Sequence, residues 1–274
     1  MRRLYLVNEV GTTYFLDYKN NTLIETIEGL GFDYEIEYQE FESNFVESKR
    51  TLPLRVISAT LLFIEGYAGF TKWRDFITKS NSLRLFNESD GTKYCYVNVK
   101  SATKSQIESG ILRSAVEFEC LSLWLVNKSK TITVVKSDEG KVYPYRYTFL
   151  YSLSFDGKIT LINESARSVP LKIRISGNVF NPRVIVRQGG KEISKMRLLL
   201  DEREQPIIEI SADPVNQYIK KIVNGEDIDI YYKQDFSYDN FLFLPPGYSE
   251  VYFDPGVREV ITCEISYREE YIAH

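Results

Sequence analysis

The residues Leu171-Lys172-Ile173-Arg174-Ile175-Ser176 place an aliphatic side chain at every second position and a polar one between. Successive side chains of a β-strand point to opposite faces, so this period of two predicts a strand with one buried and one solvated face. The same alternation recurs near the end of the sequence, in Ile261-Thr262-Cys263-Glu264-Ile265-Ser266-Tyr267. Because one-sided strands are typical of antiparallel sheets, the sequence predicts a mainly β, antiparallel fold.

Short runs of the same kind, separated by polar turns, occupy much of the second half of the chain. Many short strands at such spacing are typical of a β-sandwich or jelly roll. The further strands predicted here are Tyr145–Phe155, Lys158–Ile162, Arg183–Arg187, Ile207–Ser211, Asp227–Tyr232 and Ser249–Phe253. We therefore predict an antiparallel sandwich for this half.

The first half follows the same period. Phe32–Phe41 alternates aromatic or aliphatic with mostly acidic residues and predicts a half-buried strand. Arg55–Ile64 is more continuously apolar, which predicts a strand covered on both sides. Leu83–Phe86 and Tyr94–Val99 flank a loop that contains Asp90-Gly91, a sequence that favours a hairpin.

One segment departs from the period of two. Its large apolar residues are spaced three and four apart, as on one face of a helix: Phe70, Trp73, Phe76 and Ile77. We therefore predict a single α-helix over about residues 69–80, packed on a first domain that, like the second, is an antiparallel β-sandwich. Polar residues around Asn127–Lys130 suggest a hinge, so the predicted domains are 1–130, with the helix, and 131–274.

The charge of the chain argues against tight nucleic-acid binding. There are 34 Lys and Arg against 38 Asp and Glu, for a formal net charge of −4, and no short window is dominated by basic residues. The apolar start is interrupted by Asn8 and Glu9, so we expect no signal peptide. The longest apolar run, Leu61–Ile64, is far below the roughly 20 residues of a membrane-spanning helix. We expect synthesis in the cytoplasm and no membrane partner.

Histidine chemistry is not expected, because the sole histidine is His274 at the end of the sequence. Histidine-based triads and histidine-ligated zinc sites require an imidazole on a rigid element. Cys95, Cys120 and Cys263 lie inside apolar runs, where a thiol behaves as a small buried hydrophobe, so all three are expected to be reduced.

No cofactor or metal site is expected either. Gly189-Gly190-Lys191 lacks the flanking residues of a phosphate-binding loop and predicts a hairpin turn. A group of aspartates in the second half lacks the spacing of a calcium loop and is expected to line solvated strand edges: Asp227, Asp229, Asp235 and Asp239.

Paired carboxylates were the remaining candidates for catalysis. Glu117 and Glu119 share a strand face with Cα atoms about 7 Å apart, a separation that an inverting glycosidase could use, and Asp33, Glu35 and Glu37 share another. Any solvent-facing strand shows this alternation, so we expect solvated side chains or salt bridges. The sequence predicts no catalytic residue and no enzyme. Its 20 tyrosines fit a glycan platform or a protein assembly surface.

The order of features in the first half resembles the N-terminal domain of phage distal tail proteins. An acidic strand at 32–41 is followed by Lys49-Arg50, a buried strand, Gly66-Tyr67 and a helix with Trp73-Arg74-Asp75-Phe76. The second half resembles the galectin-like C-terminal sandwich of the same family, although Glu192–Arg203 is more highly charged than the family pattern. The matching stretches are Tyr143-Pro144-Tyr145-Arg146-Tyr147, Ile173-Arg174-Ile175-Ser176-Gly177, Asn181-Pro182-Arg183-Val184, Leu244-Pro245-Pro246-Gly247 and Ile265-Ser266-Tyr267-Arg268-Glu269-Glu270-Tyr271.

The resemblance implies a structural protein of the virion tail tip that takes part in host attachment. It implies a homohexameric baseplate hub that joins the tail tube to the tail-associated fibre or lysin and presents docking sites for receptor-binding proteins. For the second domain, loops around Tyr231-Tyr232 or Phe241-Leu242-Phe243 are candidate docking surfaces. The alternatives are a carbohydrate-binding β-sandwich module in adhesion and, less favoured, a glycoside hydrolase.

Overall fold

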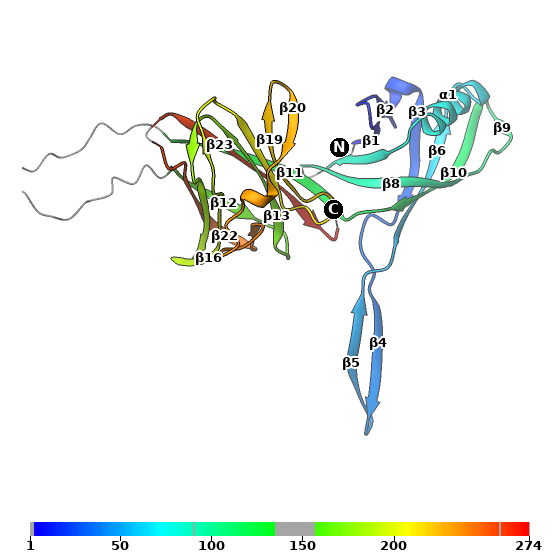
Figure 1. The fold of residues 1–274 in the computed structure, drawn as a ribbon. Helices are drawn as coiled ribbons and strands as arrows, with labels where there is room; N and C mark the ends of the chain where they lie inside the picture. The colour runs from blue at the N-terminus through cyan, green and yellow to red at the C-terminus, as the bar shows by residue number, and fades with distance from the viewer. Residues whose placement is uncertain (1–2, 90, 135–156, 258, 274) are drawn as a thin grey trace, which may run out of the picture. The chain divides into compact units, whose positions relative to one another are not determined.

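The computed structural model describes residues 3–89, 91–134, 157–257 and 259–273 (Figure 1). They fall into two compact units: unit 1 is Met1–Val126 with Glu270–His274, and unit 2 is Asn127–Glu269. The chain enters unit 2 within strand β11 (Trp124–Val134) and leaves it within β23 (Ile261–Tyr271). The predicted mainly β, antiparallel fold is confirmed. The predicted strand Tyr145–Phe155 lies outside the described residues.

Unit 1 is built on one antiparallel sheet with the order β2-β1-β7-β8-β10-β6-β3. The predicted hairpin around Gly91 is present as β7 and β8, with Leu85 opposite Cys95. The short strand β9 pairs with β10. The bounds are β1 Arg3–Asn8, β2 Thr13–Phe15, β3 Thr22–Glu28, β6 Arg55–Phe63, β7 Leu83–Glu88, β8 Thr92–Ala102, β9 Ile107–Glu108 and β10 Ile111–Cys120, with a 3-10 turn, η1, at Tyr18–Asn20.

The single α-helix of the described residues, α1 (Tyr67–Thr78), completes the core of unit 1. Trp73 is only 2% exposed, and its ring centroid lies 5.9 Å from those of Phe63 on β6 and Phe70 on the helix. The helix begins two residues earlier than predicted, because Gly66 at its N-cap has a φ of 58° and turns the chain directly out of β6. It also ends two residues earlier. It is too short to cross a membrane, and no described helix can do so.

Strand β6 is less covered than predicted. Ile57, Leu61 and Phe63 are buried on one face, whereas Ser58 on the other face is exposed. The strand is therefore one-sided, because the helix and the remaining core of unit 1 lie against only one of its faces.

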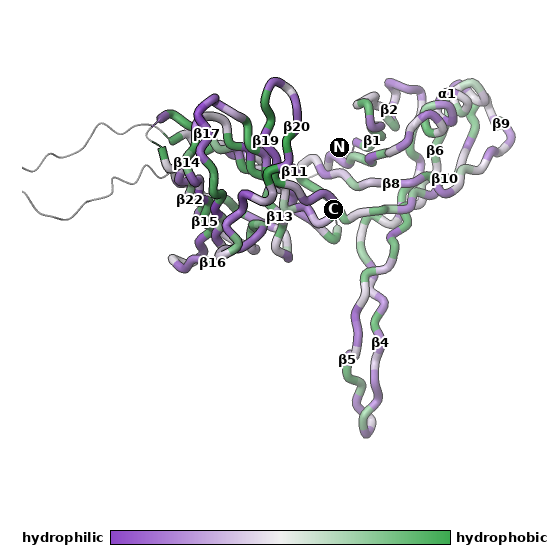
Figure 2. Tube along the Cα trace, viewed as in Figure 1, coloured by the Kyte–Doolittle hydropathy of each residue, from purple (hydrophilic) through white to green (hydrophobic). Residues whose placement is uncertain are grey.

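The predicted strand Phe32–Phe41 is present from residue 35, but its predicted half-burial is wrong. Strands β4 (Glu35–Phe41) and β5 (Asn44–Thr51) form a hairpin in which each pairs only with the other. Tyr38 is 57% exposed and Phe45 is 70% exposed. Figure 2 shows hydrophobic and hydrophilic positions mixed along the hairpin, and Figure 1 shows no second layer of unit 1 against it. Alternation without a covering layer buries neither face.

Unit 2 contains two antiparallel sheets, with the orders β11-β23-β13-β18-β19-β20 and β12-β22-β15-β16. Strand β21 pairs with the start of β13, and β14 pairs with β17. The bounds are β12 Gly157–Asn163, β13 Val169–Ser176, β14 Val179–Phe180, β15 Arg183–Gln188, β16 Lys191–Arg197, β17 Asp201–Glu202, β18 Ile207–Ser211, β19 Tyr218–Val223, β20 Glu226–Asp229, β21 Phe243–Leu244 and β22 Gly247–Asp254.

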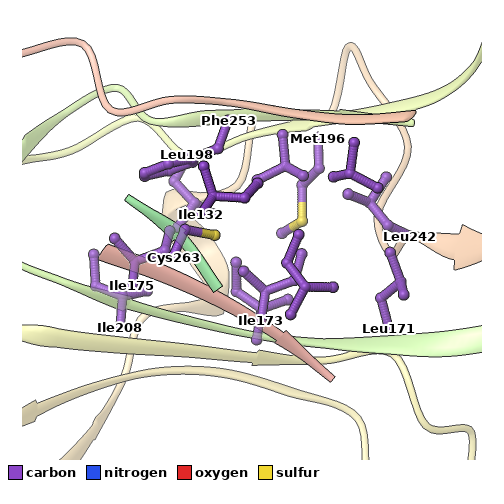
Figure 3. Close-up of a cluster of buried hydrophobic side chains, with 14 of the residues drawn as sticks. Ile132, Leu171, Ile173, Ile175, Met196, Leu198, Ile208, Leu242, Phe253 and Cys263 are labelled. Carbon is purple, nitrogen blue, oxygen red and sulfur yellow. The ribbon is translucent and has the colours of Figure 1, made fainter. Parts of the chain in front are cut away.

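The core of unit 2 lies between these sheets (Figure 3). Ile173 and Ile175 of β13 and Cys263 of β23 come from one sheet, and Met196 and Phe253 come from the other; all are buried. The residues that alternate with them are polar and lie on the outer face, so the predicted one-sided character of β13 and β23 is confirmed.

Two local predictions in unit 2 are tested by its turns. Gly189 and Gly190, with φ of 57° and 79°, form the predicted hairpin turn, which joins β15 to β16. The strand predicted over Asp227–Tyr232 ends at Asp229, where the carboxylate accepts a hydrogen bond of 2.8 Å from the Tyr231 backbone N–H. That contact starts a 3-10 turn, η2 (Tyr231–Lys233).

The burial of Trp73 can be tested by a charge substitution. We expect Trp73→Asp to unfold unit 1, because losing a buried Trp costs about 3–5 kcal/mol even before a carboxylate is buried in its place. The control is Ala68→Asp, which puts the same carboxylate on the exposed first turn of the helix, where it is favourable. Thermal melts of both variants check the expectation, and a Trp73→Asp melt within a few degrees of the parent contradicts it.

Candidate assembly and docking surfaces

The β4–β5 hairpin is the most exposed regular element of unit 1. A two-residue turn with positive φ at Glu42 (44°) and Ser43 (74°) closes it, a geometry that matches the twist of the flanking strands. An ion pair of 3.2 Å between Lys49 and Glu37 links the two strands, and the Arg50 guanidinium lies 5.2 Å from the ring centre of Tyr34. The hairpin is thus ordered by its own turn and side chains.

The hairpin tip, which we define as residues 38–47, carries apolar side chains on both faces, among polar and acidic ones. The register pairs Tyr38 with Glu47, Gln39 with Val46, Glu40 with Phe45 and Phe41 with Asn44. Since paired residues share a face and neighbours alternate, Tyr38 and Phe45 lie on one face and Phe41 and Val46 on the other. All four are exposed. Neither face of the tip is covered by the chain that carries it.

The carboxylate pairs predicted as solvated or ion-paired are found in ion pairs. Lys100 Nζ lies 3.6 Å from Glu117 Oε2 and 3.8 Å from Glu119 Oε1, so the two glutamates share one cation. Glu37 pairs with Lys49, and Asp33 and Glu35 are exposed. These contacts support the interpretation of both sets as solvated faces.

The four aspartates of unit 2 are used separately and hold turns or cations. Asp227 pairs with Lys220 at 2.7 Å, and Asp229 accepts from the Tyr231 backbone. Asp235 accepts from the Ser237 backbone N–H at 3.1 Å and from Arg197 Nε at 2.7 Å, and its hydrogen bonds with Ser237, followed by those from Arg197, hold its pKa below the ordinary value. Asp239 accepts from the Lys195 N–H at 2.8 Å. Within the described ranges, no three His, Cys, Asp or Glu residues are grouped to hold a metal ion.

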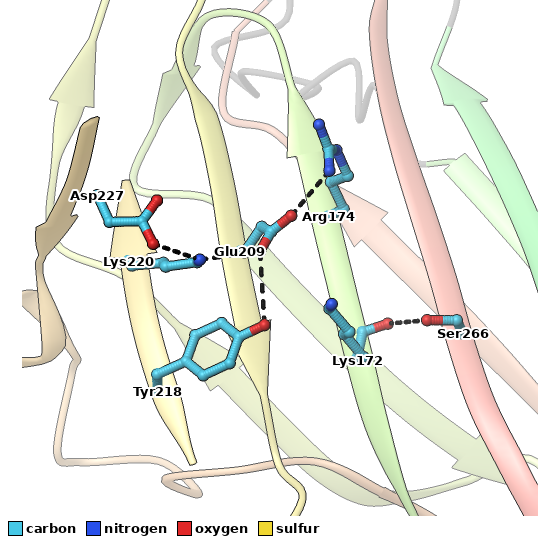
Figure 4. A network of polar contacts seen from close by, with 7 residues as sticks. All are labelled: Lys172, Arg174, Glu209, Tyr218, Lys220, Asp227 and Ser266. Atoms are coloured by element: carbon cyan, nitrogen blue, oxygen red, sulfur yellow. Dashed lines mark hydrogen bonds and ion pairs between the residues drawn. The ribbon is translucent and has the colours of Figure 1, made fainter. Parts of the chain in front are cut away.

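A charged network lies on the outer face of the β13–β18–β19 sheet and was not predicted from the sequence (Figure 4). Glu209 on β18 is only 6% exposed and accepts from Arg174 Nη1 at 2.8 Å and from the Tyr218 hydroxyl at 3.4 Å. Lys220 Nζ lies 3.5 Å from Glu209 and 2.7 Å from Asp227, and its pKa is raised, chiefly by the Asp227 bond. The network crosses four adjacent strands.

The two candidate docking loops of unit 2 differ in how exposed their side chains are. Tyr232 is 70% exposed and Phe236 is 60% exposed, whereas Gln234 and Asp235 between them are buried. Leu242, in contrast, is 1% exposed and belongs to the core, so the prediction of a docking surface at Phe241-Leu242-Phe243 is wrong. That segment packs inward because β21 pairs with the start of β13. The exposed aromatic loop is therefore Tyr231–Phe236.

The sequence and the fold of this chain can be compared with those of known proteins. Residues 3–121 match the family described as distal tail protein, N-terminal domain. In fold, the whole chain is similar to a chain of the phage P2 baseplate in its activated conformation with calcium, with a TM-score of 0.63, 13% identity and coverage of 100% of both chains. It is also similar to SPP1 Dit (gp 19.1), described as a paradigm of the hub adsorption apparatus in phages that infect Gram-positive bacteria, with a TM-score of 0.65, 11% identity and coverage of 97% and 98%. Comparison with curated proteins gives no match.

The Glu209 network predicts a difference between two conservative variants. Glu209→Gln removes the buried charge that Arg174 and Lys220 contact, and we expect it to lower the free energy of unfolding of unit 2 by about 2 kcal/mol. Asp227→Asn removes an exposed partner of the same lysine, and we expect a loss below about 1 kcal/mol. Urea unfolding of both variants measures the two losses, and equal losses would contradict a structural role for Glu209.

Proposed function

We infer that the chain is a distal tail protein, because residues 3–121 match the N-terminal domain of that family and the whole chain is similar in fold to a chain of the phage P2 baseplate and to SPP1 Dit. From this premise we propose that the chain is the structural hub of a phage tail tip. Six copies close into a homohexameric ring, assembled in the host cytoplasm and carried in the virion. The ring joins the tail tube to the tail-associated fibre or lysin and presents receptor-binding proteins during host attachment.

The exposed apolar side chains of the hairpin tip are the observation that supports the proposed self-association. An isolated two-stranded hairpin is marginally stable in water, and one with apolar side chains on both faces gains stability when another surface covers it. Tyr38, Phe41, Phe45 and Val46 are exposed within a single chain. A second copy of the chain supplies such a surface, and a contact between two different patches of identical subunits is heterologous, the type that closes into rings.

Unit 2 is proposed to be the docking domain for the other tail components. The loop Tyr231–Phe236 presents exposed aromatic side chains, and aromatic residues are enriched at the centres of protein interfaces. The ring centroid of Tyr231 lies 5.9 Å from that of Phe236, edge to face, and 6.2 Å from that of Phe241, which packs against the core and anchors the loop to its edge. The carboxylates considered for catalysis contact cations or are exposed, which supports a structural rather than an enzymatic role.

A carbohydrate-binding module is the second candidate function, favoured by the exposed Tyr232 and Tyr248 of unit 2. Flat rings of this kind stack on sugars. We expect the full chain to show neither saturable binding on a glycan array nor release of sugar from bacterial cell walls. Binding that is lost in Tyr232→Ser or Tyr248→Ser would establish the carbohydrate function instead.

Ring formation can be tested at the hairpin tip. The parent protein is expected to form six-fold rings at high concentration, in electron microscopy and light scattering. Phe45→Asp with Val46→Asp is expected to shift it to monomers with an unchanged melting temperature, because both side chains are exposed in the single chain and one lies on each face of the tip.

The matched control is Val10→Asp, which places the same charge at another exposed position of unit 1, 77% exposed and outside the hairpin. It is expected to leave the rings intact. Persistent monomers of the parent, or rings that survive the tip variant, would count against the proposed assembly.

A further inference from the structure

Two cysteines of unit 1 lie together on the buried face of its sheet. Cys120 ends β10 and is opposite Val97 of the paired strand β8. Cys95 lies two residues from Val97 on β8 and therefore points to the same face. Both side chains are buried, and their Sγ atoms are 3.9 Å apart, compared with about 2.05 Å in a disulfide. The two sulfurs are not bonded in this structure, and a disulfide between them requires the backbone to shift at one or both positions.

A cation faces this pair. Arg55, the first residue of β6, is directly opposite Cys120 in the β6–β10 ladder, where partner side chains share a face and stand about 5 Å apart at Cβ. Its Nη1 donates to the Ile272 carbonyl at 3.1 Å, and its guanidinium lies 4.9 Å from the ring centre of Trp124. In the part of the chain that the structure describes, its buried Nε and Nη2 have no hydrogen-bond partner. A thiolate at Cys120 would accept from them.

The two thiols are not equivalent. The Cys95 S–H donates to Cys120, and this bond together with the Arg55 charge lowers the pKa of Cys120. The pKa of Cys95 is raised by its contact with Cys120 and by burial. A lowered pKa beside an arginine is the environment of a nucleophilic cysteine, whereas a buried neutral thiol is inert until its partner has reacted.

Cys120, which is 5% exposed, lies in the wall of a cavity of about 700 Å³. Its walls come from the segments that join the β4–β5 hairpin to the sheet, represented by Phe32 and Leu54, and from Leu121 after β10, together with Arg55 and Cys120 themselves. This volume is in the range of sites that hold small molecules. Cys263 has no such position, because it is enclosed in the core of unit 2, where burial raises its pKa (Figure 3).

We propose that Cys120 and Cys95 form a reversible dithiol site that reacts with low-molecular-weight disulfides entering this cavity. The Cys120 thiolate attacks one sulfur of the small disulfide and expels the other half as a thiolate. Cys95 then loses its proton and attacks the Cys120 sulfur of the mixed disulfide, which releases the second thiolate. The two cysteines are oxidised to a disulfide that joins β8 to β10, and the small disulfide is reduced to two thiols.

The product would strengthen the unit that carries the hairpin. A reducing cytoplasm keeps such a pair open, and an oxidising exterior closes it. That this disulfide stabilises the tail tip after the particle leaves the host rests on the proposed function. The thiol–disulfide exchange itself rests only on the residues of unit 1. The two are separable, because exchange and ring formation are measured independently on the same sample.

The test uses full-length reduced protein and dithiobis(nitrobenzoate), an aromatic disulfide whose released thiolate is coloured. Native protein is expected to release two coloured equivalents, to lose two hydrogen atoms in mass, and to yield a peptide pair cross-linked through Cys95 and Cys120. Cys95→Ser is expected to stop after one equivalent with a stable adduct on Cys120. Cys120→Ser is expected to abolish the fast release, and Arg55→Gln to slow the first step about tenfold.

Cys263→Ser is the matched control and is expected to leave both equivalents unchanged. Circular dichroism confirms that each variant is folded, and Arg55→Lys, which keeps the positive charge, is expected to retain most of the rate. A parent protein that reacts only after urea unfolding, or that keeps a stable adduct on Cys120 while Cys95 is present, would overturn the proposal. Loss of rings with exchange intact would count against the proposed function alone.

Discussion

A β-strand with an apolar face is stabilised by a layer that covers this face, and the cores of both units depend on that constraint. In unit 1 the helix α1 supplies the cover, through Trp73 and Phe70 packed on Phe63. In unit 2 the two sheets cover each other around residues such as Ile173 and Phe253. The β4–β5 hairpin obeys the same pairing rules but has no covering layer. The candidate assembly surface is therefore a hairpin of the described chain that no second layer covers.

This difference shows what the sequence could and could not predict. Alternation in Phe32–Phe41 resembles that in Leu171–Ser176, because both report only the period of a strand. Whether a second layer lies above the strand depends on residues far away in the chain, so local pattern predicted the strand and not its exposure. The helix was found from its spacing, but its ends were displaced by two residues, because the backbone of Gly66 rather than the apolar stripe fixes where it starts.

Local sequence pattern was equally insufficient to predict the exposed surfaces, the Glu209 network and the cysteine site. The first half of the charged run Glu192–Arg203 belongs to β16, the edge strand of a sheet, where lysines and arginines keep other strands from pairing. The apolar Phe241-Leu242-Phe243 looked like an exposed surface and is core, since composition alone does not distinguish the two. Glu209 and its partners, and Arg55 with Cys95 and Cys120, are assembled by strand register. No single segment contains enough information to bring them together.

Strand register also connects the β4–β5 hairpin with the Cys95–Cys120 pair, the two features of unit 1 on which its proposed roles depend. The hairpin leaves the sheet through residues 29–34 and returns through Leu52-Pro53-Leu54 to Arg55, and parts of both connections line the cavity beside Cys120. A proline in the second connection fixes its backbone and removes one donor, which favours a short extended link over a flexible one. The direction of the hairpin therefore depends on how these links pack around Arg55. Arg55 holds the Ile272 carbonyl and faces Cys120 across the ladder, so the thiol site and the base of the hairpin share one packing arrangement.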